Sequence, residues 1–243
     1  MKLIRDILFY LSVPKCVACN ERLDKDDRAL CKACRVEYDN AIARSCSLCA
    51  KPLYECTCTT AHLDTHYIHK HIKVFRYRPQ ADLPTNKLIY SLKKDNREDV
   101  LELLADELAS SVATAFPNAS EFVFTSIPRR RAAKIKYGID HAALLSERVA
   151  RNLGAEYQKT LISKSKSEQK LSKHREERMK NARFDYISKR VDLSGRTVVL
   201  IDDVVTTGAS MSVAATLLKG VGAKRIIGAS LAIAYNDSTL KIK

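Results

Sequence analysis

Glycine and proline are scarce in this sequence, with seven and six residues in a chain of 243. This scarcity excludes collagen and low-complexity linkers. Long uninterrupted apolar runs are also missing, which excludes a membrane-spanning helix. The opening, Met1 to Pro14, places apolar side chains at helical spacing around Arg5 and Asp6, which is typical of a short amphipathic helix and not of a signal peptide. We therefore expect a cytoplasmic protein without membrane insertion.

Acidic residues are outnumbered by basic ones, 28 against 42, which gives a formal net charge of +14. A surface of this charge attracts polyanions such as nucleic acid, acidic lipid or phosphorylated small molecules.

Cysteine is absent after Cys58, and all eight cysteines lie between Cys16 and that residue. A chain without an export signal stays in a reducing compartment, where clustered thiols are metal ligands more often than disulfides. Buried or oxidised thiols are the alternative.

The cysteines are grouped in pairs, three of which enclose two residues each. Such a gap lets a tight turn present both thiolates to one tetrahedral ion, and two turns complete a site. The fourth pair, Cys56 and Cys58, encloses one residue, and His62 is an alternative to one of its sulfur atoms. We expect one or two structural zinc ions, which a segment with so few large apolar groups needs in order to fold. The predicted ligands are Cys16, Cys19, Cys31, Cys34, Cys46, Cys49, Cys56 and Cys58.

Four histidines follow closely, at His62, His66, His69 and His71. They suggest a further metal site, but no carboxylate or cysteine pattern completes one. The favoured interpretation is a polar, partly solvated connector.

Helical and strand patterns alternate after residue 60, whereas the part before it shows polar turns and no long periodic segment. This alternation predicts a parallel sheet covered by helices. The expected helices are 86–116, Asp140–Leu153 (closed by Gly154), Ala209–Val221 and a basic helical or mobile segment at 172–183; the expected strands are Glu121–Ile127, 160–162, Thr197–Ile201 and Arg225–Ala234.

The stretch from Val198 to Ser210 predicts a buried strand that ends in two carboxylates, then a hydroxyl-rich loop and a helix. Its helix N-terminus, with the hydroxyl groups and a glycine that permits close backbone approach, suits a phosphate. Asp202 and Asp203 would repel that phosphate; they suit sugar hydroxyl groups, with or without a bridging Mg²⁺. The alternative is an ordinary turn in which Asp203 caps a helix.

Other phosphate motifs do not match this loop. No Gly-Lys-Ser/Thr follows, which excludes a P-loop, and a single glycine excludes a dinucleotide fingerprint.

The run from Ile201 to Ser210 resembles the phosphoribosyl-pyrophosphate (PRPP) motif of type I phosphoribosyltransferases. With the preceding cysteine pairs, the chain resembles the ComF family of competence-associated, phosphoribosyltransferase-like proteins. The resemblance extends over nearly the whole chain, and the other matching positions are Leu8 to Pro14, Tyr77, Leu88 to Lys93, Ser126 to Pro128, Gln169, Leu171, Arg178, Asn181 and Phe184.

The resemblance implies a type I phosphoribosyltransferase-like α/β domain at 61–243 behind a double zinc-ribbon domain at 1–60. It implies that Asp202 and Asp203 bind the ribose and act in catalysis, and that the turn after Pro128 binds the diphosphate. The implied PRPP-binding residues are Arg129, Arg130, Asp202, Asp203, Val204, Val205, Thr206, Thr207, Gly208, Ala209 and Ser210, with Arg131 in the same turn.

Two segments need separate interpretations. Residues 163–180 correspond in place to the mobile loop that closes over the site in this fold, and their basic charge fits either a lid or a solvated helix face. Many family members carry Arg-Gly-Phe-Asn-Gln after the basic turn, whereas this chain has Lys136 to His141 and keeps only Gly138.

Two functions are compatible with these features. One is a Mg²⁺-dependent phosphoribosyltransferase that acts on PRPP and is associated with DNA uptake. The other is a non-catalytic adaptor of the competence machinery that binds single-stranded DNA or senses PRPP. The expected partners are PRPP, single-stranded DNA and a competence helicase.

Overall fold

The computed structural model describes residues 14–46, 49–60, 63, 66–78, 81–129, 138–163, 184–234 and 240–241. The expected N-terminal amphipathic helix and the basic segment at 172–183 lie outside these residues.

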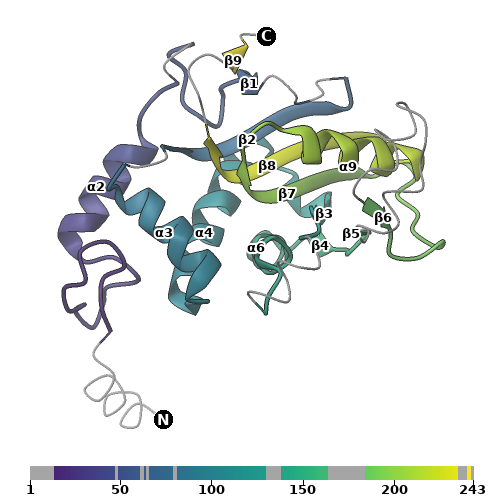
Figure 1. Cartoon of the computed structure of the whole chain (residues 1–243). Coiled ribbons are helices and arrows are strands. Elements are labelled where there is room, and N and C mark those ends of the chain that lie inside the picture. The colour runs from purple at the N-terminus through teal and green to yellow at the C-terminus, as the bar shows by residue number, and fades with distance from the viewer. Residues whose placement is uncertain are drawn as a thin grey trace, which may run out of the picture.

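A parallel sheet of five strands forms the centre of the chain (Figure 1). All four neighbouring pairs are parallel, and the long central strands are buried on both faces, as in sheets covered by helices. The expected parallel sheet is confirmed. From edge to edge the strands are β2 (Ile68–Tyr77), β8 (Arg225–Ala234), β7 (Thr197–Val205), β3 (Val123–Ser126) and β4 (Glu156–Tyr157).

Helices cover both faces of the sheet (Figure 1). One face packs against α3 (Pro84–Lys94), α4 (Glu98–Ala115) and α6 (His141–Asn152), and the other against α9 (Ala209–Gly220). Successive side chains of β7 alternate between the two cores, because strand side chains point to opposite faces. Val199 therefore packs with the α4 and α6 side, whereas Val198 packs with α9.

Shorter elements connect these layers. β1 (Thr59–Thr60) pairs antiparallel with β9 (Leu240–Lys241), β5 (Leu161–Ser163) pairs antiparallel with β6 (Phe184–Tyr186), and Ala119–Glu121 form a 3₁₀ turn, η1.

The cysteine-containing part packs directly on the helical face through α2 (Lys32–Ile42). Tyr38 of α2 is fully buried, and its ring meets Phe75 of β2 edge-on with centroids 6.2 Å apart. Cys34 belongs to the same core as Leu88 of α3. This core crosses the boundary expected near residue 60, and the division into 1–60 and 61–243 stays a prediction.

Two features of the first half of the chain differ from expectation. The part before residue 60, where no long periodic segment was expected, contains the 11-residue helix α2; its buried residues are Cys34 and Tyr38, and so narrow an apolar face leaves little periodicity in the sequence. The histidine-containing stretch at 62–71, expected to be a polar, partly solvated connector, is so only in part: His66 and His69 are exposed, whereas β2 begins at Ile68 and His71 is buried in it.

Two boundaries also differ. The helical pattern at 86–116 is divided into α3 and α4, because Asn96 between them has a positive φ of 52° that no helix continues through. The strand expected to end at Ile201 continues to Val205, since β8 runs beside it as far as the Val205–Ile233 pair. The two acidic residues therefore lie within the strand.

The remaining expectations are confirmed. The strands at 121–127, 160–162 and 225–234 and the helices at 140–153 and 209–221 are present within a few residues, and Gly154 follows α6 with a φ of 65°. No helix in the described part of the chain has the length and apolar character needed to span a membrane.

Candidate functional site

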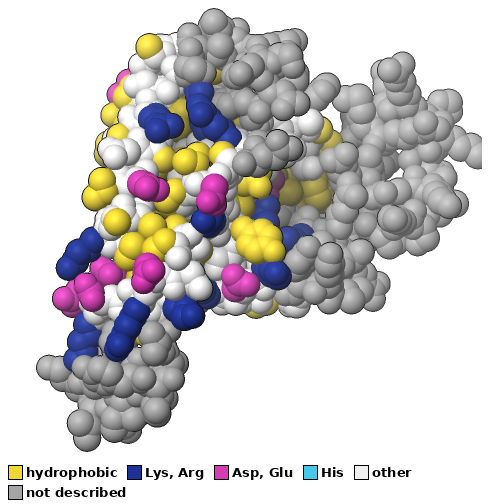
Figure 2. Space-filling model, turned by 60° about the vertical axis from the view of Figure 1, so that its left-hand side comes forward, with side chains coloured by type: hydrophobic (Ala, Val, Ile, Leu, Met, Phe, Trp, Pro, Cys, Tyr) yellow, Lys and Arg dark blue, Asp and Glu magenta, His cyan; other side chains and the backbone are white. Residues whose placement is uncertain are grey.

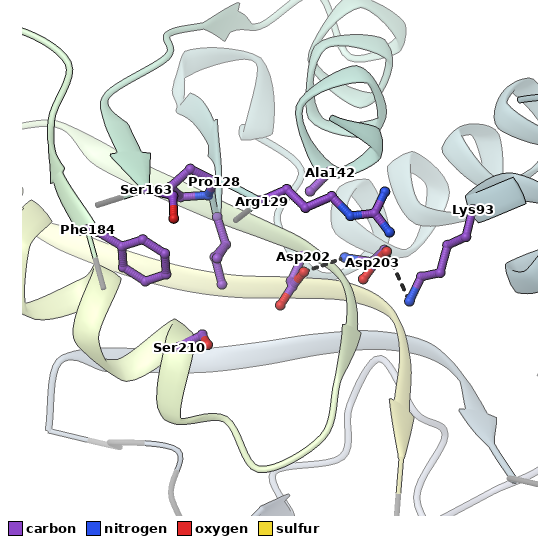
Figure 3. Close-up of a pocket in the computed structure, with 10 residues that line it drawn as sticks. Lys93, Pro128, Arg129, Ala142, Ser163, Phe184, Asp202, Asp203 and Ser210 are labelled. Carbon is purple, nitrogen blue, oxygen red and sulfur yellow. Dashed lines mark hydrogen bonds and ion pairs between the residues drawn. The ribbon is translucent and has the colours of Figure 1, made fainter. Parts of the chain in front are cut away.

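A cavity of about 220 Å³ opens where the carboxyl ends of β3 and β7 meet the first turn of α9 (Figure 3). This edge of an open α/β sheet is where ligands bind. The lining residues are Lys93, Ile127, Pro128, Arg129, Ala142, Ser163, Phe184, Asp202, Asp203 and Ser210.

Asp202 and Asp203 face one another across the cavity floor and are held by the backbone. The N–H of Asp203 donates to Oδ1 of Asp202 at 2.9 Å, and the N–H of Val204 donates to Oδ1 of Asp203 at 2.7 Å. The ammonium of Lys93, from the end of α3, lies 3.1 Å from Oδ2 of Asp203 (Figure 3). Lys93 therefore forms an ion pair with Asp203 at the edge of the cavity.

Asp202 has a strongly perturbed acidity. Burial of its carboxyl group and the negative charge of Asp203 raise the pKa of Asp202 well above its ordinary range, while the N–H of Asp203 and the charge of Lys93 act in the opposite direction. A cation or a set of sugar hydroxyl groups would relieve this repulsion. Raised carboxyl pKa values in a cavity are typical of functional sites.

The loop between β7 and α9 turns sharply at Gly208, whose φ is 81°. A Cβ atom there would lie 2.7 Å from Oγ1 of Thr60 and 2.9 Å from Cβ of Leu63, so the backbone needs a glycine for two reasons. The hydroxyl of Thr60 donates to the carbonyl oxygen of Thr207 at 2.8 Å. The segment that follows the last cysteine thus supports the candidate phosphate loop.

Arg129 reaches the cavity from the turn after β3 and hydrogen-bonds Nδ1 of His141, the first residue of α6. Nε2 of His141 lies 2.6 Å from Oδ1 of Asn96, in the turn between α3 and α4. His141 is 2% exposed. Hydrogen bonds thus link the Arg129 guanidinium, after β3, to the start of α6 and then to the turn between α3 and α4.

Four of the predicted PRPP-binding residues line this cavity: Arg129, Asp202, Asp203 and Ser210. Residues 206–208 form the turn before α9, Ala209 begins that helix beside Ser210, and Val205 packs in the core beside α9. Val204 packs beside the core on the opposite face. Two of the predicted residues, Arg130 and Arg131, lie outside the described residues. The same holds for the candidate lid at 163–180, apart from Ser163.

Six cavity residues were not identified as PRPP-binding residues from the sequence: Lys93, Ile127, Pro128, Ala142, Ser163 and Phe184. Lys93 and Phe184 stand at positions matched by the family resemblance, which was the available signal. Lys93 precedes Asp203 by more than 100 residues, so no local pattern predicted the contact between these two side chains.

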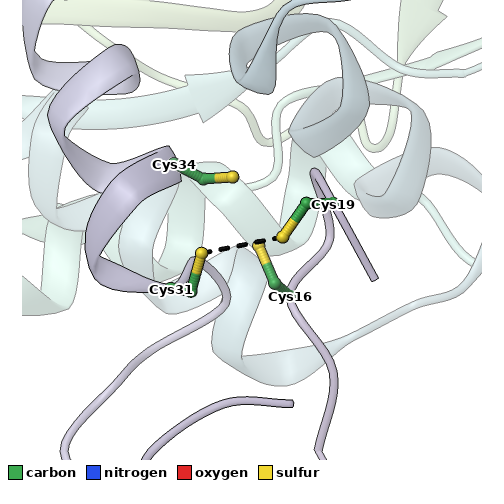
Figure 4. A group of neighbouring side chains, drawn as sticks. All are labelled: Cys16, Cys19, Cys31 and Cys34. Atoms are coloured by element: carbon green, nitrogen blue, oxygen red, sulfur yellow. Dashed lines mark hydrogen bonds between the residues drawn. The ribbon is translucent and has the colours of Figure 1, made fainter. Parts of the chain in front are cut away.

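The first cysteine group brings four thiols together (Figure 4). Their sulfur atoms lie within 4.8 Å of one another, with Sγ of Cys19 3.6 Å from Sγ of Cys31. Four thiolates around zinc at about 2.3 Å stand about 3.8 Å apart, so this group fits a tetrahedral ion. Cys31 is the N-cap residue of α2, and Cys34 lies in the first turn of that helix.

The second group consists of Cys46, Cys49, Cys56 and Cys58, whose sulfur atoms also lie within 4.8 Å of one another. Burial raises the pKa of the Cys58 thiol to about 12 and also raises the pKa of Cys56, so a bound cation would be needed to hold these two groups as thiolates at neutral pH. The structure thus brings four cysteines together despite the single-residue gap between Cys56 and Cys58. His62, the alternative ligand, lies outside the described residues.

The two groups begin with the same turn. The N–H of Asn20 donates to the carbonyl of Cys16 at 2.9 Å, and the N–H of Ala50 donates to that of Cys46 at 2.8 Å. Both residues have positive φ, 65° and 56°. This repeated geometry is what two related metal-binding turns require.

Lys73 of β2 stands beside the second group. It is 1% exposed, and its ammonium donates to the carbonyl oxygens of Cys56 at 3.0 Å and Cys58 at 2.5 Å. Its charge opposes the effect of burial on the Cys56 thiol, whose pKa is nevertheless raised. Buried charges need such partners, and four thiolates around a divalent ion provide the negative charge.

The histidines do not gather into a metal site among the described residues, where the two cysteine groups are the clusters suited to an ion. His71 is buried, and its Nε2 lies 3.0 Å from Oγ of Ser230 on β8. Burial lowers its pKa to about 3, so this imidazole stays neutral as a part of the sheet core.

Comparison with known proteins agrees with this arrangement. Residues 139–243 match the family described as Phosphoribosyl transferase domain. The chain is 24% identical to the Competence protein ComFC of Bacillus subtilis (strain 168) over 207 residues, which are 80% of this chain and 79% of that protein. It is 36% identical over 55 residues to Ribose-phosphate pyrophosphokinase 2 of Archaeoglobus fulgidus, 22% of this chain and 20% of that protein.

Among solved structures, an adenine phosphoribosyltransferase is similar over 58% of this chain and 74% of its own, with a TM-score of 0.42 and 16% identity. The resemblance that the sequence motifs indicate is confirmed by the match to ComFC, by the domain match and by the two cysteine groups. The chain is thus similar to ComFC over most of its length, and two groups of four cysteines precede the stretch that matches the phosphoribosyl transferase domain.

Proposed function

We propose that this protein binds PRPP together with Mg²⁺ in the cavity of Figure 3 and transfers its phosphoribosyl group. One observation carries the proposal: the acid pair at Asp202 and Asp203 shares a single cavity with Ser210 at a helix start and with Arg129. A ribose with a phosphate at one end and a diphosphate at the other needs two anion-binding groups, with hydrogen-bond acceptors for its hydroxyl groups between them.

The 5′-phosphate belongs at the start of α9, where N–H groups and the hydroxyl of Ser210 face the cavity. The ribose hydroxyl groups belong on Asp202 and Asp203, and the diphosphate on the side of Arg129 and Lys93. On arrival of the ligand, Lys93 would exchange its contact with Asp203 for the diphosphate, so that no lysine charge is left unpaired.

The distribution of charge along the chain supports this orientation. Residues 130–137, which follow Arg129, contain four basic residues and no acidic one. Residues 164–183 contain eight basic and three acidic residues and are flanked by Ser163 and Phe184, both of which line the cavity. Much of the excess positive charge therefore lies in segments that are adjacent in the sequence to residues lining this cavity.

The chain's own contribution to transfer is positioning and charge. The bond between ribose C1 and the diphosphate breaks with its electron pair on the diphosphate, while a lone pair of the acceptor forms the new bond and the acceptor proton passes to the diphosphate or solvent. Arg129 and Lys93 would stabilise the leaving charge, and Asp203 the positive charge that develops on the ribose. Mg²⁺ held by the acid pair and the diphosphate would add further charge stabilisation.

Thermal unfolding with and without ligand tests the binding. PRPP at 100 times its dissociation constant stabilises the fold by about 2.7 kcal/mol. For a chain of this length that corresponds to a rise in Tm of roughly 5–11 °C. Ribose 5-phosphate, which lacks the diphosphate, is expected to give part of the rise.

Asp202→Asn with Asp203→Asn should remove most of the PRPP effect. The matched control is Asp26→Asn with Asp27→Asn, a second adjacent acid pair that lies far from the cavity in the cysteine-containing part. Equal PRPP shifts in the wild type and in the Asp202/Asp203 variant would contradict the assignment of this site.

Transfer itself is tested by diphosphate release from PRPP over a screen of bases and amines. Release that depends on an acceptor and is lost in the Asp202/Asp203 variant supports a phosphoribosyltransferase. A normal thermal shift without any release would keep the PRPP site and favour a sensor.

A second candidate function is an adaptor that binds single-stranded DNA, in keeping with the net charge of +14 and with the competence role in the name of the Bacillus subtilis relative. Among the coloured residues of the face shown in Figure 2, basic and acidic side chains are interspersed, so the described part of that face offers no continuous basic track. The charge for such binding would have to come from elsewhere, with the segment at 164–183 as the first candidate by sequence. A competence helicase as partner stays a prediction.

Salt dependence tests this candidate. Each phosphate contact on a single strand contributes about −0.7 to the slope of log K against log salt. Lys170→Glu with Lys173→Glu should reduce the slope if the basic segment takes part. Absence of binding at low salt, or a slope near zero, would rule out the adaptor.

A further inference from the structure

Arg129, His141 and Asn96 form a chain of hydrogen bonds that runs from the cavity to the turn between α3 and α4. Arg129 lines the cavity after β3, His141 begins α6 directly behind it, and Asn96 stands behind His141. The His141 side chain is buried, with 2% of the residue exposed. None of the catalytic roles proposed above uses it.

The direction of these bonds is set by the arginine. A guanidinium has only donors, so Nδ1 of His141 must be the acceptor and carries no proton. The remaining nitrogen, Nε2, then carries the ring proton and donates to Oδ1 of Asn96 at 2.6 Å. The geometry therefore requires a neutral imidazole with its proton on Nε2.

The surrounding charges favour this neutral form. Burial and the positive charges of Arg129 and Lys93 lower the pKa of His141 from its ordinary value, while Asp203 and Asp140 act in the opposite direction. A doubly protonated ring would place an N–H against the guanidinium and release Arg129.

We propose that His141, held by Asn96, is a positioning residue that orients the guanidinium of Arg129 toward the diphosphate of the ligand. This inference rests on the proposed PRPP function. An arginine fixed before the ligand arrives loses less side-chain freedom on binding, which raises affinity. His141, which orients Arg129, belongs to α6 and to the stretch at 139–243 that matches the transferase family. Asn96, which orients His141, lies outside that stretch.

Binding of two ligands separates this role from a structural one. PRPP carries the diphosphate and ribose 5-phosphate does not, so only PRPP should respond. His141→Leu is expected to weaken PRPP binding about ten-fold, the range for a hydrogen bond to a charged group, and to leave ribose 5-phosphate unaffected. Calorimetric titration of both ligands, with Mg²⁺, measures the two constants.

Two further variants keep the test valid if His141→Leu does not fold. Asn96→Gly removes the acceptor at a position whose positive φ suits glycine, and should weaken PRPP binding in the same sense. His141→Gln offers a carbonyl oxygen to Arg129 and an amide N–H to Asn96, so it should restore most of the affinity that His141→Leu loses.

A double-mutant comparison shows whether His141 acts through Arg129. In an Arg129→Met background, His141→Leu should cause no further loss of PRPP affinity. The wild type should also lose affinity relative to His141→Gln as the pH falls and the imidazole takes up a proton, because glutamine does not titrate.

The role is overturned if His141→Leu leaves PRPP binding unchanged, if ribose 5-phosphate is weakened equally, or if the loss persists without Arg129. Failure of the wild-type protein to bind PRPP at all would instead contradict the proposed function. The two failures are therefore distinguishable.

Discussion

Thr60 donates its side-chain hydroxyl to the main-chain carbonyl of Thr207 at 2.8 Å and so joins the end of the cysteine-containing part to the candidate phosphate loop. Cys58 lies two residues before Thr60, and Gly208 lies one residue after Thr207. Thr60 is also the position that a Cβ atom on Gly208 would meet first. The cysteine-containing part and the candidate phosphate loop are therefore in direct contact.

The first prediction concerns this contact. Gly208→Ala should lower Tm and reduce the PRPP-induced shift, because the left-handed backbone costs about 1–2 kcal/mol with a Cβ atom and crowding against Thr60 and Leu63 adds about 1–3 kcal/mol. Gly195→Ala is the matched control, with a φ of 74° and nothing within 4 Å of the added atom. Equal losses in the two variants would contradict the crowding.

The second prediction is two zinc ions per chain. Elemental analysis of the purified protein should find two equivalents, and Cys31→Ser and Cys58→Ser should each remove one, because the cysteines form two separate groups of four. One equivalent in the wild type would mean that a group does not hold an ion. Cys58→Ser should in addition weaken PRPP binding more than Cys31→Ser does, since Thr60 follows it closely.

The third prediction concerns the buried lysine. Lys73→Met should lower the zinc affinity of the second group, measured by competition with a chromogenic chelator, because it removes the buried positive charge that is hydrogen-bonded to the carbonyl oxygens of Cys56 and Cys58. Lys70→Met on the same strand is the control, since the Lys70 ammonium lies over the Phe116 ring instead. A Lys73→Met protein that retains zinc as firmly as the control would remove this role.

The fourth prediction links acidity to stability. The pKa of Asp202 is raised in the folded state, so above the ordinary pKa of an aspartate the folded protein holds a proton that the unfolded chain gives up. The free energy of unfolding therefore falls as the pH rises above that value. Asp202→Asn should therefore raise the Tm of the ligand-free protein, more at pH 8 than at pH 5, while removing most of the PRPP shift. A gain independent of pH, or a loss of Tm at pH 8, would contradict the raised pKa.

Much of the sheet and the acid pair could be predicted because local patterns encode them. Val198 to Ile201 is an uninterrupted apolar strand, and the loop after it contains the chemistry of the site within a few residues. β2 could not be predicted in the same way, since Lys73 and His71 are buried there through partners on distant elements, Cys56, Cys58 and Ser230.

The same limit applies to the cavity. Lys93 reaches it, and Asn96 reaches His141 behind it, only because α3 and α4 pack against the sheet, and no periodicity in the sequence indicates that approach. His141 was noted in the sequence as part of a departure from the family pattern, and its role became visible only once Arg129 was placed beside it. Contacts made through tertiary packing are the part that spacing along a chain does not encode.

The order of the strands has a consequence for dissecting the molecule. β3 lies between β7 and β4, and β2 covers the outer edge of β8, yet both β2 and β3 precede the matched stretch at 139–243. A fragment cut to that stretch would leave β4 without its neighbour and two long strands with bare hydrogen-bonding edges, a composition prone to aggregate. The recognisable transferase segment is thus not a portable module, and fusion or truncation experiments on this protein should keep at least the chain from β2 onward.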